Sequence, residues 1–168
     1  MATFAKLVAF SSLAAATACG TGLAAGDRPC TAIGSLEGVS LDLKAPYAAK
    51  VASASMKVCW NGTCRTSKVR LMTSSKSVPQ GCTDDAPDGS CGAIASPTGD
   101  KHGFADVQGL PKSPVQVTVD LRDASGKRLL SERLDVTPHA TFPNGPDCGE
   151  GGPQARLVVT NARVTEAT

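Results

Sequence analysis

The sequence has few helix-favouring residues, few aromatic residues and only two histidines. Glu and Gln are scarce, whereas Val, Thr, Ser, Gly (17) and Pro (11) are plentiful among the 168 residues. This composition indicates short strands joined by turns rather than helices. Aromatic residues make up 4% of the chain, and past the N-terminal region they are Tyr47, Trp60, Phe104 and Phe142. So few rings argue against a lectin that stacks sugars on aromatic side chains. Sugar recognition through hydrogen bonds in loops stays open.

Runs of basic residues are absent as well. Charged residues are 19% of the chain, the net charge is +2, and Lys and Arg are interspersed with Asp and Glu. Proteins that bind nucleic acid usually carry a basic patch or stripe, so we expect no nucleic-acid partner. A hydrophobic fraction of 41% also excludes a disordered tail and a multi-span membrane protein.

An apolar stretch does lie at the N-terminus. After Lys6 comes "LVAFSSLAAATA", residues 7–18, which ends in the small-x-small pattern Ala16-Thr17-Ala18. The stretch is too short to span a membrane and has the cleavage pattern of a secretory signal. We therefore expect residues 1–18 to be a signal peptide.

A cysteine follows the expected cleavage site. The order "AAATACG" resembles a bacterial lipobox, in which the cysteine after the cut is lipidated, although that motif prefers a larger aliphatic residue than Ala16. We expect a lipid on Cys19, with residues 19–29 as a tether to the membrane surface. Ordinary secretion, with cleavage after Ala18 or at the second small site at residues 24–26, is the alternative.

Six cysteines remain beyond Cys19, and an even number in an exported chain indicates disulfides. The sequence alone allows many pairings, but two pairs flank short turn-rich segments that bring their ends together. The predicted pairs are Cys59–Cys64, Cys82–Cys91 and, by elimination, Cys30–Cys148. The spacings C-x4-C and C-x8-C differ from the C-x2-C pairs of zinc sites, and no cofactor is expected.

The stretch "VCWNGTCR", residues 58–65, predicts a tight hairpin. Asn-Gly is the strongest two-residue hairpin signal and favours a type I′ turn. This register places Trp60 opposite Thr63, and Cys59 opposite Cys64 at a Cα separation of about 4.5 Å. The disulfide should then lie on the solvent side and Trp60 on the core side. The glycosylation motif that begins at Asn61 is incidental, since the turn itself needs the asparagine.

Apolar residues alternate with polar ones from residue 39 onward, most clearly in "VQVTVDLR", residues 115–122. Several such segments separated by turns predict one antiparallel β-sandwich over residues 30–168, of immunoglobulin or fibronectin type III kind, with six to eight strands. Two long loops are expected, at residues 74–100 and 137–154.

Glu132 interrupts this alternation, because it shares a face with Leu130, Leu134 and Val136. Either a bulge at Leu129-Leu130 shifts the phase of the strand, or Glu132 faces a functional group. The bulge is the favoured interpretation.

Few residues are candidates for chemistry. His102 lies near Asp100 and Asp106 and would be the general base of a small hydrolase, with Glu132 as another candidate, but no nucleophile motif accompanies them. A loop histidine is the simpler interpretation. Asp84, Asp85 and Asp88 share one turn and suggest a Ca²⁺ site, although their spacing does not fit an EF-hand.

Several segments together resemble small predicted lipoproteins of high-GC Gram-positive bacteria. They are "TACG", "RPCTAIGSLEGVSL", "VCWNGTCR", "GFADVQGLP" and "TFPNGPDCGEGGPQARLVV". The resemblance implies export and a lipid anchor but carries over no activity. The sequence therefore predicts a non-catalytic binding or scaffold protein on the outer face of the cell membrane, or secreted, with an unknown protein or glycan ligand. A hydrolase and a Ca²⁺- or glycan-binding module are the alternatives.

Overall fold

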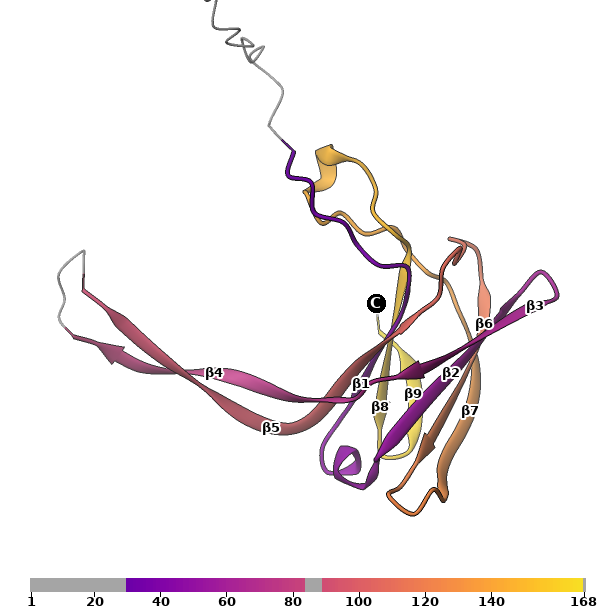
Figure 1. The fold of residues 1–168 in the computed structure, drawn as a ribbon, viewed down its shortest axis with the longest axis horizontal. Coiled ribbons are helices and arrows are strands. Elements are labelled where there is room, and N and C mark those ends of the chain that lie inside the picture. Colours follow the sequence, from indigo (N-terminus) through magenta and orange to yellow (C-terminus); the bar gives the residue numbers. More distant parts are fainter. Residues whose placement is uncertain (1–29, 84–88, 168) are drawn as a thin grey trace, which may run out of the picture.

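The computed structural model describes residues 30–83 and 89–167, which form two packed β-sheets (Figure 1). The strands are β1 (Gly38–Leu43), β2 (Ser53–Trp60), β3 (Thr63–Val69), β4 (Met72–Cys82), β5 (Cys91–Asp106), β6 (Val115–Arg122), β7 (Arg128–Val136), β8 (Gln154–Thr160) and β9 (Arg163–Glu166). Sheet A has the order β4-β5-β1-β8-β9, and sheet B has the order β3-β2-β6-β7. Neighbouring strands are antiparallel except β1 and β8, which are parallel. The predicted all-β sandwich is confirmed, but the described residues form nine strands rather than six to eight, and the β1–β8 pair departs from the expected antiparallel arrangement.

The core lies between the inward faces of the two sheets. Every second residue of the central strands is buried, as in the pattern BiBiBiBe of β6. Sheet A contributes Leu41, Leu43, Leu157 and Val159, and sheet B contributes Met56, Val58, Val117, Val119 and Leu121. The intervening residues point outward and remain free to be polar. Two short 3₁₀ turns, Tyr47–Lys50 and Pro146–Cys148, are the helical segments within the described ranges.

The predicted hairpin at residues 58–65 is confirmed in its register. Trp60 pairs with Thr63 and Cys59 with Cys64, and Asn61 and Gly62 have φ values of 48° and 75°, as a type I′ turn requires. The Cα atoms of the two cysteines lie 4.1 Å apart. Trp60 packs against the core, as expected, and Arg65 lies 5.9 Å from the centre of its ring.

All three predicted disulfides are present. Cys30–Cys148 and Cys82–Cys91 join Cα atoms 5.5 Å and 3.9 Å apart. The first bridge holds the start of the described chain against the loop that precedes β8. Three bridges in a domain of this size indicate that the protein folds in an oxidising compartment.

The expectation of a long loop at residues 74–100 is wrong. Here β4 and β5 continue as a two-stranded ribbon that projects from the sandwich (Figure 1). The pairing of β5 with β1 ends at Lys101, so beyond that point β4 and β5 pair only with each other. We call this part, residues 74–82 and 91–99, the arm. The sequence misled because a ribbon that covers no core has no need of alternating apolar residues.

The chain crosses from sheet B to sheet A directly over Gly103. A Cβ atom at this position would lie 2.5 Å from Val69 Cγ1 and 2.6 Å from the carbonyl oxygen of Arg70. Both distances are shorter than any normal contact, so only glycine lets the connection between β3 and β4 pass this close to β5.

Gly103→Ala is therefore expected to lower the free energy of unfolding by about 1–3 kcal/mol, because the new methyl group must push the crossing backbone away. Gly92→Ala is the matched control, since its Cβ would meet nothing closer than Gln80 Cβ at 3.6 Å. Urea denaturation of both variants measures the difference. Equal stability of the two variants would contradict the tight crossing.

Candidate functional site

The arm leaves the sandwich where residues 73–75 of β4 lie opposite residues 97–101 of β5, a region that we call the arm root. The register of β4 and β5 runs from Thr73 opposite Lys101 to Ser75 opposite Pro97, so Ser74 faces three residues of β5. The extra residues form a β-bulge, and Gly99 within it has a φ of +82°. Bulges bend a strand and increase its twist, which accounts for the change of direction where the arm departs.

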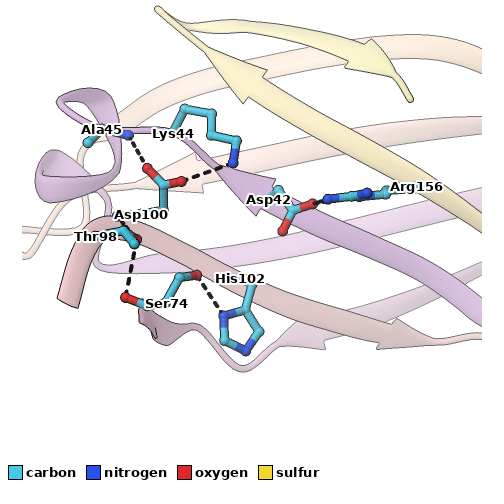
Figure 2. Close-up of polar contacts among 8 residues, drawn as sticks. All are labelled: Asp42, Lys44, Ala45, Ser74, Thr98, Asp100, His102 and Arg156. Carbon is cyan, nitrogen blue, oxygen red and sulfur yellow. Dashed lines mark hydrogen bonds and ion pairs between the residues drawn. The ribbon is translucent and has the colours of Figure 1, made fainter. Parts of the chain in front are cut away.

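Asp100 fastens this bulge to the end of β1. Its carboxylate accepts the backbone N–H of Ala45 at 2.8 Å and pairs with Lys44 Nζ at 2.9 Å (Figure 2). The hydrogen bond from Ala45, followed by that from Lys44, holds the pKa of Asp100 below its ordinary value. The carboxylate is thus a structural acceptor in its ionised form.

At the arm root, a second set of contacts joins β4 to β5. Ser74 Oγ lies 2.9 Å from Nδ1 of His102, and Thr98 Oγ1 donates to the carbonyl of Ser74 at 3.2 Å. Figure 2 shows His102 turned toward Ser74 and Asp100 turned toward Lys44 and Ala45. The polar groups at the root therefore hold strands in place.

The arrangement expected for a hydrolase is not assembled among the described residues. His102 hydrogen-bonds to Ser74, Asp100 is held by Ala45 and Lys44, and Asp106 lies at the opposite end of the β1–β5 ladder, paired with Gly38. Asp42 is the cross-strand neighbour of His102, but its carboxylate holds Arg156, with an N–O distance of 2.7 Å. The structure gives no support to a catalytic relay here.

The arm itself is exposed on nearly all sides. Its described residues carry a single charged side chain, Lys76, and Ile94 at its middle is 55% exposed. Val78 pairs directly with Ile94, so the two apolar side chains share one face of the ribbon. The tip is closed by the Cys82–Cys91 disulfide.

Each of the two strands of the arm carries one proline, Pro79 in β4 and Pro97 in β5. Pro79 pairs with Ala93 and Pro97 pairs with Ser75, at positions four pairs apart in one register. Because proline has no N–H, both fit an unbroken ladder where the N–H of another residue would point outward. Each open edge therefore lacks a donor that a further strand would need. The prolines limit strand addition and leave the faces of the ribbon as its contact surfaces.

Glu132 does lie on the inward side of sheet B, opposite Val119. The predicted bulge exists, since Leu121 pairs with Leu130 and Arg122 with Arg128, but it precedes Glu132 and leaves its face unchanged. The carboxylate reaches across the rim of the sandwich and accepts the backbone N–H of Val164 in β9 at 2.9 Å. Glu132 thus ties the edge strands of the two sheets together.

A polar hollow of about 460 Å³ lies at the end of the sandwich near Cys148, between the segments 33–37 and 143–153. Its acidic side chains are engaged, because Glu37 accepts the N–H of Gly109 and Glu150 pairs with Lys112. Asn144 closes the hollow through two hydrogen bonds of 2.9 Å to the backbone of Ile33. These contacts make the hollow a structural junction between chain segments.

Two sequence predictions fall outside the described residues. The proposed Ca²⁺ ligands Asp84, Asp85 and Asp88 and the lipidation site Cys19 lie in segments that the structure does not describe. Within the described ranges no group of three His, Cys, Asp or Glu residues is placed to hold a metal ion. No helix in those ranges is long and apolar enough to cross a membrane.

Comparison with protein-family models, with curated proteins and with solved structures finds no match for this chain.

The lowered pKa of Asp100 gives a testable pH dependence at the root. Its ionised form is favoured by folding, so the contact is complete above the ordinary pKa of about 3.9 and is lost as the pH falls through the lowered value. We expect the amide proton shift of Ala45 in NMR spectra to titrate with a midpoint below about 3.9. Asp100→Asn should abolish this titration, and Asp106→Asn should leave it unchanged. A midpoint at or above the ordinary value would contradict the contact.

Removal of the carboxylate at position 132 should weaken the rim of the sandwich. Glu132→Ala leaves the N–H of Val164 without its acceptor, and we expect the free energy of unfolding to fall by about 1–2 kcal/mol. Glu132→Gln keeps an acceptor oxygen and should cost less, while Asp135→Ala, on the outward face of the same strand, should cost least. An alanine variant at position 132 as stable as the unmodified protein in urea denaturation would show that the tie is unimportant.

Proposed function

We propose that this protein is an exported, non-catalytic binding module that presents the arm to a partner protein. The supporting observation is the arm itself, a disulfide-closed ribbon that projects from a compact sandwich and covers none of its core. A ribbon of this kind costs conformational entropy to order and gains little burial within its own chain. A contact outside the chain gives such an element a use.

The site geometry favours binding over catalysis. The titratable groups near the arm root are each engaged in holding strands together, and the exposed surface lies further out, on the arm. The apolar pair Val78 and Ile94 offers a small anchor on one face, and the prolines at the edges direct a partner toward that face rather than toward strand addition.

The location proposed for the module is the outer face of the cell membrane, with a lipid on Cys19, or the exterior after secretion. The three disulfides support the oxidising compartment, and the lipobox-like "AAATACG" supports the anchor. Kinship with immunoglobulin or fibronectin type III domains is proposed on the two packed, mostly antiparallel sheets alone.

The proposal is tested by removing the apolar anchor of the arm. The double variant Val78→Ser/Ile94→Ser replaces both apolar side chains with small polar ones at positions outside the core, so the sandwich should melt at an unchanged temperature. Cross-linking in intact cells followed by mass spectrometry should then recover fewer partner proteins, by roughly tenfold for an anchor pair at the centre of a contact.

Met72→Ser is the matched control, because Met72 is 49% exposed but lies before the arm begins. The control should recover the same partners as the unmodified protein. The proposal fails if the double variant and the control recover the same partners in the same amounts, or if the unmodified protein recovers none.

A further inference from the structure

The outward face of sheet B gathers positive charge from all four of its strands. The buried alternates of these strands fix which residues point outward, and the register places those residues side by side. Lys57 and Arg133 flank Thr118 in one row across the sheet, and Lys68 faces Ser55 in the next. The cations of this face are Lys57, Lys68, Arg122, Arg128 and Arg133, and its acids are Asp120 and Asp135. We call it the cationic face.

Three of these cations are free of partners among the described residues. Arg128 pairs with Asp120 at 3.4 Å, and Arg122 donates to the carbonyl of Gly126 at 2.8 Å. The side chains of Lys57, Lys68 and Arg133 make no hydrogen bond or ion pair within the part of the chain that the structure describes. All three are exposed, so their charges are available to a ligand.

The cationic face is also hollowed. A depression of about 430 Å³ is lined by Ser53, Ser55, Lys68, Asp120 and Arg122, together with Ala54 and Val69. The two serines are short, and the register pairs Ser55 with Lys68 and Ser53 with Arg122. Hydroxyl, ammonium and guanidinium groups around one depression are donors suited to a phosphate or carboxylate group, and Asp120 is offset by its ion pair with Arg128.

We propose that the cationic face binds a linear polyanion, a polymer that carries phosphate or carboxylate groups at short intervals. Lys57 and Arg133 lie two strands apart, about 10 Å, and rows along the strands repeat every two residues, about 7 Å. Several anionic groups of an extended chain can therefore be neutralised at once, with one of them seated between Lys68 and Arg122.

The chemistry of the face favours a polymer over a membrane surface. The exposed large hydrophobic residues of the described chain are Ile33, Leu36, Met72, Ile94 and Phe142, and none belongs to the strands of sheet B. Binding to the lipid interface draws on apolar side chains that insert beside the charges. No aromatic residue lies on the face to stack against bases, since Trp60 points to the core side, and this disfavours single-stranded nucleic acid.

The test is a fluorescence anisotropy titration of the disulfide-bonded protein with labelled polyphosphate and with labelled poly-glutamate. The unmodified protein should bind at least one of them, with an affinity that falls steeply between about 50 mM and about 200 mM salt. Binding to one polymer alone identifies the anionic group. The variant Lys57→Glu/Lys68→Glu/Arg133→Glu should lose roughly one order of magnitude in affinity or more.

The matched control is Lys50→Glu/Lys76→Glu/Arg163→Glu, which changes the net charge equally at exposed residues outside the cationic face. It should retain the affinity of the unmodified protein, and both variants should keep the same melting temperature. Equal loss in both variants would mean bulk attraction without a site, and no binding to either polymer at low salt would refute the proposal. Binding to phosphatidylglycerol vesicles in preference to both polymers would overturn it in favour of a membrane surface.

Because the triple variant leaves Val78 and Ile94 untouched, recovery of partner proteins by the arm should be unaffected. The proposal for the arm and the proposal for the cationic face can therefore be refuted independently of each other.

Discussion

Burial of one face of each sheet against the other is the constraint on which the rest of the structure depends. Leu41 and Leu157 from one sheet and Val117 and Val119 from the other fill the space between the layers. Burial of such side chains stabilises a domain by about 25 cal/mol per Å² of apolar surface removed from water. Because strands alternate, this requirement determines half of the residues and leaves the outward half open to other uses.

The outward-facing residues, which this constraint leaves open to change, carry the distinguishing features of the molecule. On sheet B they form the cationic face. At the edge of sheet A, β4 and β5 continue beyond the core as the arm, and neither face of this ribbon is buried. Glu132 is an exception on the inward side, where it lies at the rim and meets the edge N–H of Val164 rather than the apolar interior. A carboxylate tolerated at that place needs a donor, and the neighbouring edge strand supplies one.

Local signals in the sequence predicted local structure well. Asn61-Gly62 determined the turn, the register and the pairing of Cys59 with Cys64, because a two-residue hairpin leaves no other arrangement. The strand at residues 115–122 and the three disulfides followed from alternation and from cysteine spacing. The arm did not, since Ser75, Pro79 and Ala93 carry no apolar pattern, and a ribbon without a core shows no period of two.

The cationic face escaped sequence analysis for a related reason. Its lysines and arginines are spread from residue 57 to residue 133 with no basic run, and only the register of four strands brings them together. The absence of a basic run thus gave no information about a patch built across a sheet. The hydrogen bonds of the arm root were equally invisible, because Lys44 and Asp100 are 56 residues apart.

The arm and the cationic face belong to different sheets, so the two proposed contacts do not compete for the same residues. A module of this kind would connect an anionic polymer on one side with a protein on the other. Such a role depends on a ribbon that keeps its shape without support from the sandwich. The bulge, the ion pair of Asp100 and the tip disulfide are the features that supply this shape.

Hydrogen exchange of the arm amides tests this claim most directly. The proline positions imply that the amides of Lys76, Val78, Ile94 and Ser96 point into the β4–β5 ladder, and we expect them to be protected from exchange. In Cys82→Ser/Cys91→Ser this protection should be lost while the amides of β6 keep theirs. Unprotected arm amides in the disulfide-bonded protein, or equal loss of protection in the arm and in β6, would contradict an independent ordered arm.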